Sequence, residues 1–536
     1  MTEITDRAEP FTEIERARLA PYFTNLDGHV FALTNLPETV KGALFARYSR
    51  SSKSLRRLFL DEFADHVDTD TARTSNVGID RAEKLYAKVF NDYGDDSVAQ
   101  LGGAHIACEY ASNILTKVLE WGRLMAYLEQ STRYVPYTDK LHGRWRYHVP
   151  AELSGALCDR YVRMLDDTFE RYSRWIAPMQ EHFGRRHPKS PGDSDAVHRS
   201  AVRAKALDTL RGMLPAATQS NVGIFGTGQA FESLLLRMRA NPLAEVRAFA
   251  DEILIELRKV IPAFLTRIDQ PDRGGRWSGY LADTRNAVES IAEDLLAGER
   301  AQARQEVTLT DFDPDGEINV VAAALYSVSD LPDDQILAIA RRMTADERAH
   351  VLRAYVGTRA NRRHRPGRAF ERTGYRFDIL TDYGAFRDLQ RHRLLTLEWQ
   401  PLSTRHGFTE PEAIREAGAG DDWARVMEGS AELYEAIRGA GLRDVAPYAV
   451  PMAYRVRFYL DMNAREAMHL IELRTAPQGH PAYRRVCQEM HRLIADVAGH
   501  RCIAAAMTFT DHSVVELERL GSERALERKR TTRETQ

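Results

Sequence analysis

Two short stretches of the chain combine hydroxyl and guanidinium groups in a way that suits an anion. Ser403 and Arg405 lie two positions apart, and Ser131 and Arg133 repeat this arrangement in the first half of the chain. In an extended backbone, residues two apart point to the same side, so each pair can converge on one phosphate. A hydroxyl and a guanidinium bind a phosphate monoester through charge-assisted hydrogen bonds. The alternative interpretation is a surface ion pair that follows a helix.

A cationic triplet, Arg391-His392-Arg393, precedes the second of these stretches. The pattern over 385–397 predicts a helix, on which adjacent residues lie about 100° apart, so the two arginines cannot share one face. Charged groups beside Leu394 and Leu395 are costly unless a partner neutralises them. A diphosphate or the acidic surface of a partner subunit would do so, and a solvated basic edge is the alternative.

A third stretch, residues 463–474, predicts a helix that carries polar groups on two sides. Asn463 and Arg474 are close to three turns apart and therefore share one stripe of the helix. Arg465 and His469 share a different stripe, together with Glu472. A core helix needs no polar groups on two sides, so this pattern indicates either a binding site or a subunit interface with paired charges.

A basic run between residues 359 and 368 includes His364. Such runs are typically solvated, and no aromatic residue that could stack on a base occurs before Phe370. Nucleic acid is therefore not an expected partner.

The composition is typical of a globular protein, and the small net charge means that any basic binding site must be local. The chain has 536 residues, 43% hydrophobic and 28% charged, with a net charge of -3. This length predicts two or three domains, and the charge gives no general attraction to polyanions. No apolar run is long enough for a membrane helix and no signal-peptide pattern opens the chain, so a cytoplasmic protein is expected. The four cysteines lack paired spacing and are expected to be buried free thiols.

The elements that must position these residues occur in the same order twice. In each half, an opening mixed segment leads to a long helical pattern (residues 101–127 in the first half), a Ser-Thr-Arg stretch and a pair of helices. The expected fold is a helix-rich α+β fold with two related modules, each with a small, mainly antiparallel sheet and long helices. The predicted modules are residues 1–270 and 306–521, separated by a linker at 271–305 and followed by a flexible charged tail at 522–536.

Taken together, these stretches resemble the flavin-dependent (alternative) thymidylate synthases, whose signature is RHRxxSxNExSxRY. Arg391-His392-Arg393 matches the triplet, Ser403 and Arg405 match the later positions, and His406 replaces the tyrosine. Glu398 falls where the asparagine is expected, and two extra residues occur around Trp399–Leu402.

The remaining parts of the family pattern are divided between the two halves. Asn463, Arg465, Leu473 and Arg474 fit the downstream helix NxRxxxxxxxLR. In the first half, the stretch from Glu129 through Ser131 and Arg133 to Tyr134 fits the nucleotide half of the signature, whereas the triplet has become Trp121-Gly122-Arg123. The two halves are therefore similar to diverged tandem copies of one module.

The resemblance implies reductive methylation of dUMP, or a related uridylate, at C5, with FAD as cofactor and with NADPH and methylenetetrahydrofolate as co-substrates. It implies that flavin contacts come from five residues: Arg391, His392, Arg393, Asn463 and His364. It further implies catalytic roles for Ser403 and Arg474. The implied nucleotide contacts are Arg405, Glu398, Glu129, Ser131, Arg133 and Tyr134.

The family builds its sites between the subunits of a tetramer, so a homodimer of this chain is expected to mimic that tetramer. The working site would then combine the flavin half of the second module with the nucleotide half of the first. Two alternatives remain open at this stage. One is another flavin-dependent modification of a pyrimidine nucleotide, and the other is a non-catalytic homologue that binds a nucleotide or a protein.

Overall fold

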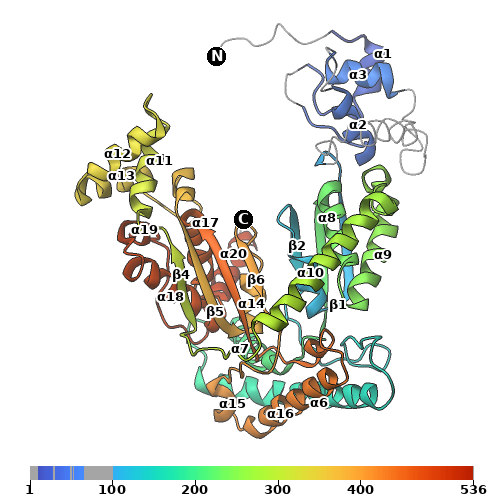
Figure 1. Cartoon of the computed structure of the whole chain (residues 1–536), viewed down its shortest axis with the longest axis vertical. Helices are drawn as coiled ribbons and strands as arrows, with labels where there is room; N and C mark the ends of the chain where they lie inside the picture. Colours follow the sequence, from blue (N-terminus) through green and yellow to red (C-terminus); the bar gives the residue numbers. More distant parts are fainter. Residues whose placement is uncertain (1–9, 28–30, 49–50, 52, 65–99, 535–536) are drawn as a thin grey trace. The chain divides into compact units, whose positions relative to one another are not determined.

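The computed structural model describes residues 10–27, 31–48, 51, 53–64 and 100–534, in two compact units (Figure 1). The first unit contains residues 1–109, 124–129 and 221–299, and the second contains 110–123, 130–220 and 300–536. The units therefore do not follow the predicted module boundaries, because residues 110–123 and 130–220 of the first module lie in the second unit. Among the described residues, no helix has the length and apolar character needed to cross a membrane.

The first sheet has three strands in the order β1 (Gly103–Ser112), β3 (Gln219–Thr227) and β2 (Met125–Glu129). β2 and β3 are antiparallel, with Glu129 opposite Val222. The long helix predicted for residues 101–127 is wrong. This segment instead forms β1, the short helix α5 (Asn113–Leu119) and β2, because Ser112 caps α5 and most of the remaining residues pair in the sheet.

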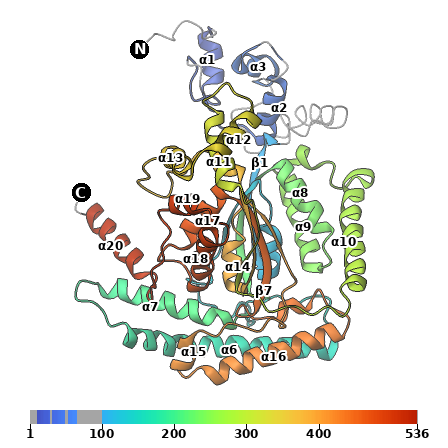
Figure 2. The ribbon, with the colours of Figure 1, turned by 60° about the vertical axis from the view of Figure 1, so that its left-hand side comes forward.

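The second sheet has four strands in the order β4 (Val307–Phe312), β5 (Gly374–Asp382), β7 (Arg455–Asn463) and β6 (Thr396–Trp399), all antiparallel to their neighbours. The predicted strand at 307–312 is confirmed as β4. Buried and half-buried side chains alternate along β5 and β7, as expected for strands with one face in a core. The helices α14 (Tyr383–Leu389), α17 (Ala464–Arg474) and α18 (Pro481–Asp496) pack against this sheet (Figure 2).

The two sheets repeat one arrangement of strands and helices. In the first module, β1 runs into α5, β2 follows, and β3 runs into α8 (Gly228–Arg239) between the other two strands. In the second module, β5, α14, β6, β7 and α17 have the same order and the same sheet positions, and β4 is added at the edge. The predicted helix-rich α+β fold with two related modules and small antiparallel sheets is confirmed.

Parts of the two modules contact each other within the second unit. Pro215 lies opposite Pro451 in an antiparallel bridge. On one side, Ala216 N donates to Val450 O at 2.8 Å, and on the other, Met452 N donates to Leu214 O at 2.9 Å. These two hydrogen bonds join equivalent positions of the two modules.

Two long helices, α6 (Gly155–Arg186) and α16 (Gly420–Gly439), pack together in the same unit (Figures 1 and 2). Trp175 Nε1 on α6 donates to the carboxylate of Asp422 on α16 at 2.7 Å. Helix α7 (Asp195–Leu210) follows α6 and packs against it.

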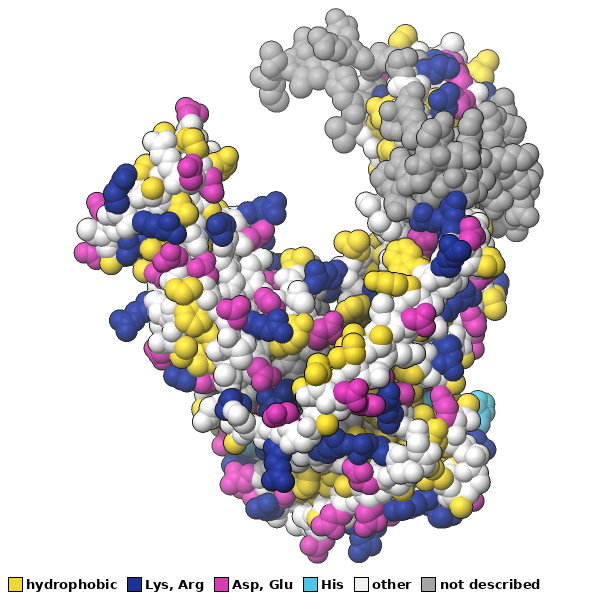
Figure 3. Space-filling model, in the orientation of Figure 1, with side chains coloured by type: hydrophobic (Ala, Val, Ile, Leu, Met, Phe, Trp, Pro, Cys, Tyr) yellow, Lys and Arg dark blue, Asp and Glu magenta, His cyan; other side chains and the backbone are white. Residues whose placement is uncertain are grey.

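The predicted linker and tail are largely helical. Within 271–305, a π-helical turn (Pro271–Gly275) leads into α10 (Arg276–Leu295), which buries no residue and exposes apolar side chains along its length (Figure 3). The tail prediction needs correction, because α20 (Leu520–Glu534) packs on α7. Arg524 of α20 forms an ion pair with Asp193 at 2.5 Å, which holds the helix in place.

The other helices surround these elements in both units. In the first unit they are α1 (Glu13–Leu19), α2 (Glu38–Tyr48), α3 (Leu55–Glu62) and α9 (Ala244–Arg258). In the second unit they are α11 (Gly316–Tyr326), α12 (Asp333–Arg342), α13 (Ala345–Val356), α15 (Glu412–Glu416) and α19 (Arg501–Ala506). Short 3₁₀ turns occur at Arg211–Met213, Pro262–Leu265, Arg368–Arg372 and Ala446–Ala449.

Candidate functional site

The cationic triplet lies in the turn between α14 and β6. The predicted helix over 385–397 is wrong in its second half, because α14 ends at Leu389 and β6 pairs with β7 from Thr396 onward. The turn separates the three side chains: His392 is buried, Arg393 is exposed, and Arg391 is partly exposed. A histidine thus enters the core between two arginines that stay nearer to solvent.

His392 connects the two ends of α17. Arg474 Nε donates to His392 Nε2 at 3.0 Å, and His392 Nδ1 lies 3.1 Å from Glu466 Oε1. Asn463 caps the same helix by accepting from Glu466 N at 2.9 Å. Burial, together with the charge of Arg474, lowers the pKa of His392 well below its ordinary value, so its ring is neutral at pH 7.

His392, Glu466 and His469 could in principle hold a metal ion, since their ligand atoms lie within 4.8 Å of one another. Two guanidinium groups already occupy the ring nitrogens, however. Arg474 donates to His392, and Arg365 Nη2 lies 2.8 Å from His469 Nδ1. Because these positive charges would oppose a divalent cation, the group is better suited to hydrogen bonding than to metal binding.

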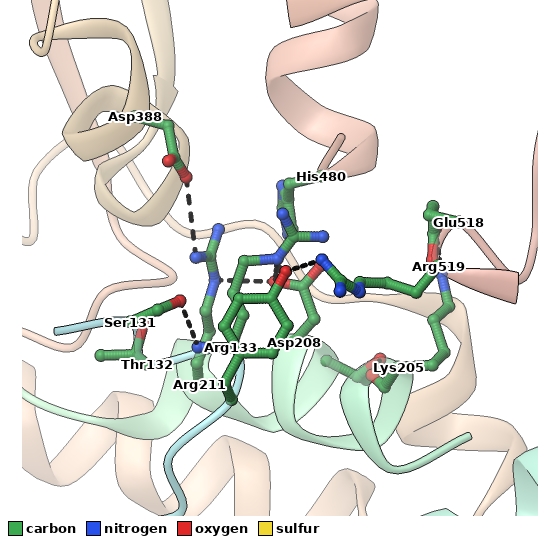
Figure 4. Close-up of polar contacts among 12 residues, drawn as sticks. Ser131, Thr132, Arg133, Lys205, Asp208, Arg211, Asp388, His480, Glu518 and Arg519 are labelled. Atoms are coloured by element: carbon green, nitrogen blue, oxygen red, sulfur yellow. Dashed lines mark hydrogen bonds and ion pairs between the residues drawn. The ribbon is translucent and has the colours of Figure 1, made fainter. Parts of the chain in front are cut away.

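Four arginines from both modules surround two aspartates in the second unit, and we call this group the arginine cluster. Figure 4 shows Arg133, Arg211, Asp208 and Asp388 of this group. Asp208, on α7, pairs with Arg133 Nε at 3.0 Å and with Arg211 Nε at 3.2 Å. Asp388, on α14, lies 3.9 Å from Arg211, 3.9 Å from Arg391 and 3.7 Å from Arg474. The members of the cluster are Arg133, Arg211, Arg391, Arg474, Asp208 and Asp388.

The arginine cluster carries a net positive charge. Burial alone would raise the pKa of Asp388, but Arg391, Arg474 and the other guanidiniums hold this pKa at about 2. The same balance lowers the pKa of Asp208. His480 lies 3.8 Å from Asp208, and burial lowers its pKa to about 3, so it is neutral. Four positive charges against two negative charges leave a surplus of two.

One arginine of the cluster offers an unused donor. The Nη2 atom of Arg211 is buried and has no hydrogen-bond partner among the described residues. Arg211 also borders a cavity of about 240 Å³, which Asp208, His480, Lys205, Asp382 and Arg485 help to line. A buried donor without an acceptor indicates a place where a ligand oxygen or a water can bind.

The first Ser-Thr-Arg stretch forms a turn and not the predicted extended chain. Ser131 Oγ accepts a hydrogen bond from Arg133 N at 3.3 Å, and Ser131 O accepts from Tyr134 N and Val135 N. The serine side chain therefore folds back on its own turn. Arg133 nevertheless points to Asp208 (Figure 4). The guanidinium of Arg519 lies 4.5 Å from the centre of the Tyr134 ring.

The second Ser-Thr-Arg stretch lies elsewhere. Ser403 is buried beside Tyr434, whose pKa is raised by burial, and Arg405 is exposed. The structure thus places Arg133, and not Arg405, in the arginine cluster that also contains Arg474.

Three other predicted site residues are not members of the arginine cluster. Glu129 is the buried last residue of β2, in the first unit. Glu398 is exposed on β6, opposite Tyr459. His364 is exposed, and its Nδ1 accepts from Ala360 N at 3.3 Å, whereas its neighbour Arg365 reaches His469.

The interpretation of the basic run as solvated is wrong for Arg359. Its guanidinium makes two hydrogen bonds of 2.6 Å to Glu472, and both side chains are buried. This pair anchors the start of the run to α17.

A second cavity, of about 370 Å³, borders the triplet. Its lining includes Leu394 and Leu395 from the turn and Asn463 and Met462 from β7. It also includes two arginines, Arg123 and Arg372, and two carboxylates, Glu371 and Asp461. Arg123 belongs to the first module and donates to Thr396 Oγ1 at 3.1 Å, so this cavity also combines both modules. The two guanidiniums are matched by two carboxylates, so the lining residues carry no surplus positive charge for a diphosphate.

Sequence reasoning missed five residues of this region: Asp208, Arg211, Asp388, His480 and Glu466. Asp388 precedes Arg391 by three residues, which places the two side chains within reach of each other around a helix end. Arg211 belongs to a Leu-Arg-Gly-Met-Leu-Pro segment that resembles Leu442–Pro447 in sequence, and this similarity was the available signal, although the structure pairs Pro215 with Pro451 and not with Pro447.

The four cysteines are free thiols. Cys108 and Cys487 are buried, and burial raises the pKa of each thiol to about 12. Cys158 and Cys502 are only half-buried, contrary to the expectation of four buried thiols.

Comparisons with known proteins agree with the duplicated fold. A family model described as thymidylate synthase complementing protein matches residues 38–263 and 308–499. A UPF0159 protein of Chlamydia muridarum is 36% identical over 520 residues, which cover 96% of this chain and 98% of the relative. A UPF0159 protein of Thermoplasma acidophilum is 30% identical, with coverage of 90% and 97%.

More distant similarities involve single modules. A flavin-dependent thymidylate synthase of Clostridium tetani is 25% identical over 190 residues, which cover 34% of this chain and 70% of the relative. A solved structure of the UMP/dUMP methylase PolB from Streptomyces cacaoi, bound with 5-Br dUMP, matches 38% of this chain and 97% of its own at 20% identity. The TM-score of this match is 0.29. The family match covers most of the chain in two segments, and the chain therefore belongs to the thymidylate synthase complementing protein family.

Proposed function

We propose that the protein binds a pyrimidine nucleoside monophosphate at the arginine cluster and catalyses the FAD-dependent reductive methylation of dUMP, or a related uridylate, at C5. In this proposal methylenetetrahydrofolate supplies the carbon and NADPH supplies the reducing equivalents. Family membership supports the class of reaction. The choice of nucleotide site depends on the arginine cluster.

The observation that carries the proposal is the charge of the arginine cluster. Four arginines and two aspartates leave a surplus of two positive charges, and a phosphate monoester carries about -1.5 to -2 at pH 7. Guanidinium groups bind phosphate oxygens through paired hydrogen bonds, and Arg211 offers a free Nη2 donor. A nucleoside monophosphate therefore matches the cluster in both charge and hydrogen bonding.

The proposed site is composite. Arg133 and Arg211 come from the first module, and Arg391 and Arg474 come from the second. In this arrangement Ser131 shapes the turn that carries Arg133, and Tyr134 and Glu129 flank that turn in sequence. In this proposal Arg133, of the first Ser-Thr-Arg stretch, makes the nucleotide contact that the resemblance also assigned to Arg405.

The cavity beside the triplet is the proposed place for part of the cofactor. Leu394 and Leu395 would contact an aromatic ring of FAD there, and Arg123 and Arg372 would donate to its polar groups. Asn463, which lines this cavity, and Arg391, His392 and Arg393, which flank it in sequence, would complete the flavin site. When bound, FAD would accept electrons from NADPH and return a hydride to the one-carbon unit.

The protein's own residues would bind and orient in this reaction. Arg474 would contact the nucleotide while His392 fixes the guanidinium through its Nε2 atom. The neutral ring of His392 keeps this contact a simple hydrogen bond, without repulsion between two cations.

Absorption spectroscopy tests the flavin assignment. The purified protein, with and without added FAD, is expected to show a bound flavin spectrum. A colourless protein that cannot be reconstituted would contradict the flavoenzyme assignment and favour the binding homologue. NADPH oxidation is then measured with dUMP and methylenetetrahydrofolate together. Oxidation without formation of thymidylate would favour another modification of the pyrimidine.

A further inference from the structure

Glu466 is a buried carboxylate for which the proposed reaction has no assigned use. It lies on the first turn of α17, and its side chain is 4% exposed. Burial of a carboxylate is costly unless a partner accepts or supplies a proton. Its partner is His392, at 3.1 Å.

We propose that Glu466 is a positioning residue, which sets the tautomer of His392 and through it holds Arg474 at the arginine cluster. This inference rests on the proposed function, because it assigns Arg474 a role in nucleotide binding. It adds a proton-linked control of that role.

The tautomer follows from the hydrogen bonds of His392. Arg474 is always protonated, so its Nε can only donate, and His392 Nε2 must accept. A neutral imidazole that accepts at Nε2 carries its proton on Nδ1. That proton points to Glu466 Oε1, so a carboxylate at position 466 stabilises the tautomer that Arg474 requires.

Arg474 connects His392 to the arginine cluster. Its Nη1 lies 3.7 Å from Asp388, and its guanidinium lies 5.5 Å above the Tyr483 ring. If His392 carried its proton on Nε2, two donors would face each other and Arg474 would move away. The chain of contacts therefore runs from Glu466 through His392 to the proposed phosphate site.

The surroundings of Glu466 make it the group of this set that titrates near neutrality. Burial raises its pKa to about 7, against the lowering effect of Arg365 and Arg465. His469 has a pKa lowered to about 4 by burial and by neighbouring arginines, and His392 is also neutral. The charged or titratable groups that face Glu466 come from α17, the triplet turn and the basic run: Arg465, His469, Arg474, His392 and Arg365.

The direction of the pH effect follows. Above pH 7, Glu466 is ionised, accepts from Nδ1 and keeps Arg474 in place. Below pH 7, Glu466 gains a proton and can donate to Nδ1, which moves the ring proton to Nε2 and releases Arg474. Nucleotide binding should therefore weaken as the pH falls through about 7.

Titration calorimetry with dUMP at pH 6.5 and pH 8.5 tests this inference. The ionised fraction of a group with a pKa near 7 falls about fourfold over this range, and the affinity of the native protein should fall by at least that factor. Glu466→Gln keeps an acceptor for Nδ1 but cannot titrate. Its affinity should change less than about twofold between these two pH values, because only the phosphate group of dUMP, with its second pKa near 6, still titrates.

Glu466→Leu removes the acceptor and should lower the affinity at pH 8.5 on the order of tenfold. Glu489→Gln, on α18, removes a carboxylate of a surface pair with Arg492 and should behave as the native protein does. The inference is overturned if Glu466→Gln keeps the native pH dependence, or if Glu466→Leu binds dUMP as tightly as the native protein.

A second measurement separates this inference from the proposed function. Nitrogen NMR of protein labelled with 15N-histidine reports the tautomer without a nucleotide, with His392 assigned through His392→Gln. The native protein should show the proton of His392 on Nδ1. If dUMP does not bind at all, the proposed function fails while this readout still decides the tautomer. A proton on Nε2 would overturn the positioning role.

Discussion

Arg211 Nη1 lies 3.9 Å from Asp388 Oδ2, although the two residues come from different halves of a duplicated sequence. Arg211 follows α7 of the first module, and Asp388 lies near the end of α14 of the second. Their approach closes the arginine cluster, so the candidate site exists only where both modules contribute.

Exchange of Arg133 for alanine is expected to weaken dUMP binding about tenfold to a hundredfold, because a charge-assisted contact to phosphate is lost. Arg405→Ala, its counterpart in the second module, should change the affinity less than about threefold. Calorimetry with dUMP measures both variants, and thermal unfolding serves as the control for folding. Equal binding by Arg133→Ala and the native protein would refute the composite site.

Exchange of Asp208 for asparagine should lower the stability of the free protein and increase the stabilisation that dUMP provides. It raises the surplus charge of the arginine cluster from two to three and leaves Arg133 and Arg211 without their shared partner. The free protein should lose on the order of 3 kcal/mol of stability, as for other broken buried ion pairs. Added dUMP should then raise the melting temperature more than it does for the native protein.

Asp195→Asn is the matched control for this experiment. Asp195 pairs with Lys189 at the surface end of the same helix, and its side chain is 68% exposed. It should alter neither the stability nor the response to dUMP. A variant Asp208→Asn that is as stable as the native protein would show that the ion pairs of Asp208 are not structural.

The buried carboxyl of Glu466 should make the protein less stable at high pH. Its pKa is raised from 4.5 to about 7, so the folded state holds a proton that the unfolded state has released. Its stabilising contribution is complete below pH 4.5 and is lost as the pH rises through about 7. Glu466→Gln should therefore be more stable than the native protein at pH 8 by up to about 3 kcal/mol, and nearly equal to it at pH 5. Denaturant unfolding at both pH values measures the difference.

A homodimer remains the predicted assembly. Light scattering after size-exclusion chromatography should give twice the chain mass of 60.8 kDa. A mass of one chain at micromolar concentration would contradict the prediction, and so would a mass of four chains.

The sequence allowed the candidate site to be predicted where short motifs carry the information. Arg391-His392-Arg393, Arg133 and the helix ending at Arg474 were recognised from residue types and spacing. Of these five arginines and histidines, all except Arg393 join the connected set around Asp388 and Glu466. The strand at 307–312 was also predicted, because alternating residues directly indicate an edge of a sheet.

Other features depend on tertiary contacts that no local pattern reveals. Residues 101–127 have helical spacing, yet about half of them form strands that pair with residues more than 90 positions away. The triplet leaves its predicted helix for the same reason, since β6 is ordered by β7. Asp208 is an ordinary helical aspartate in the sequence, and only the fold brings Arg133 and Arg211 to it.

The bridge between Pro215 and Pro451 has a genetic consequence. In an assembly of identical subunits, every substitution appears in all copies of the site, so no copy can be altered alone. Here the two modules that meet at this bridge are encoded by different parts of one gene. A substitution therefore changes one module only. Arg133 could thus be retained while Arg405 became exposed, and Arg391 could be retained while its counterpart became Trp121. Because the two modules are fused in one chain, evolution can conserve the residues of one site while the equivalent residues of the other site change.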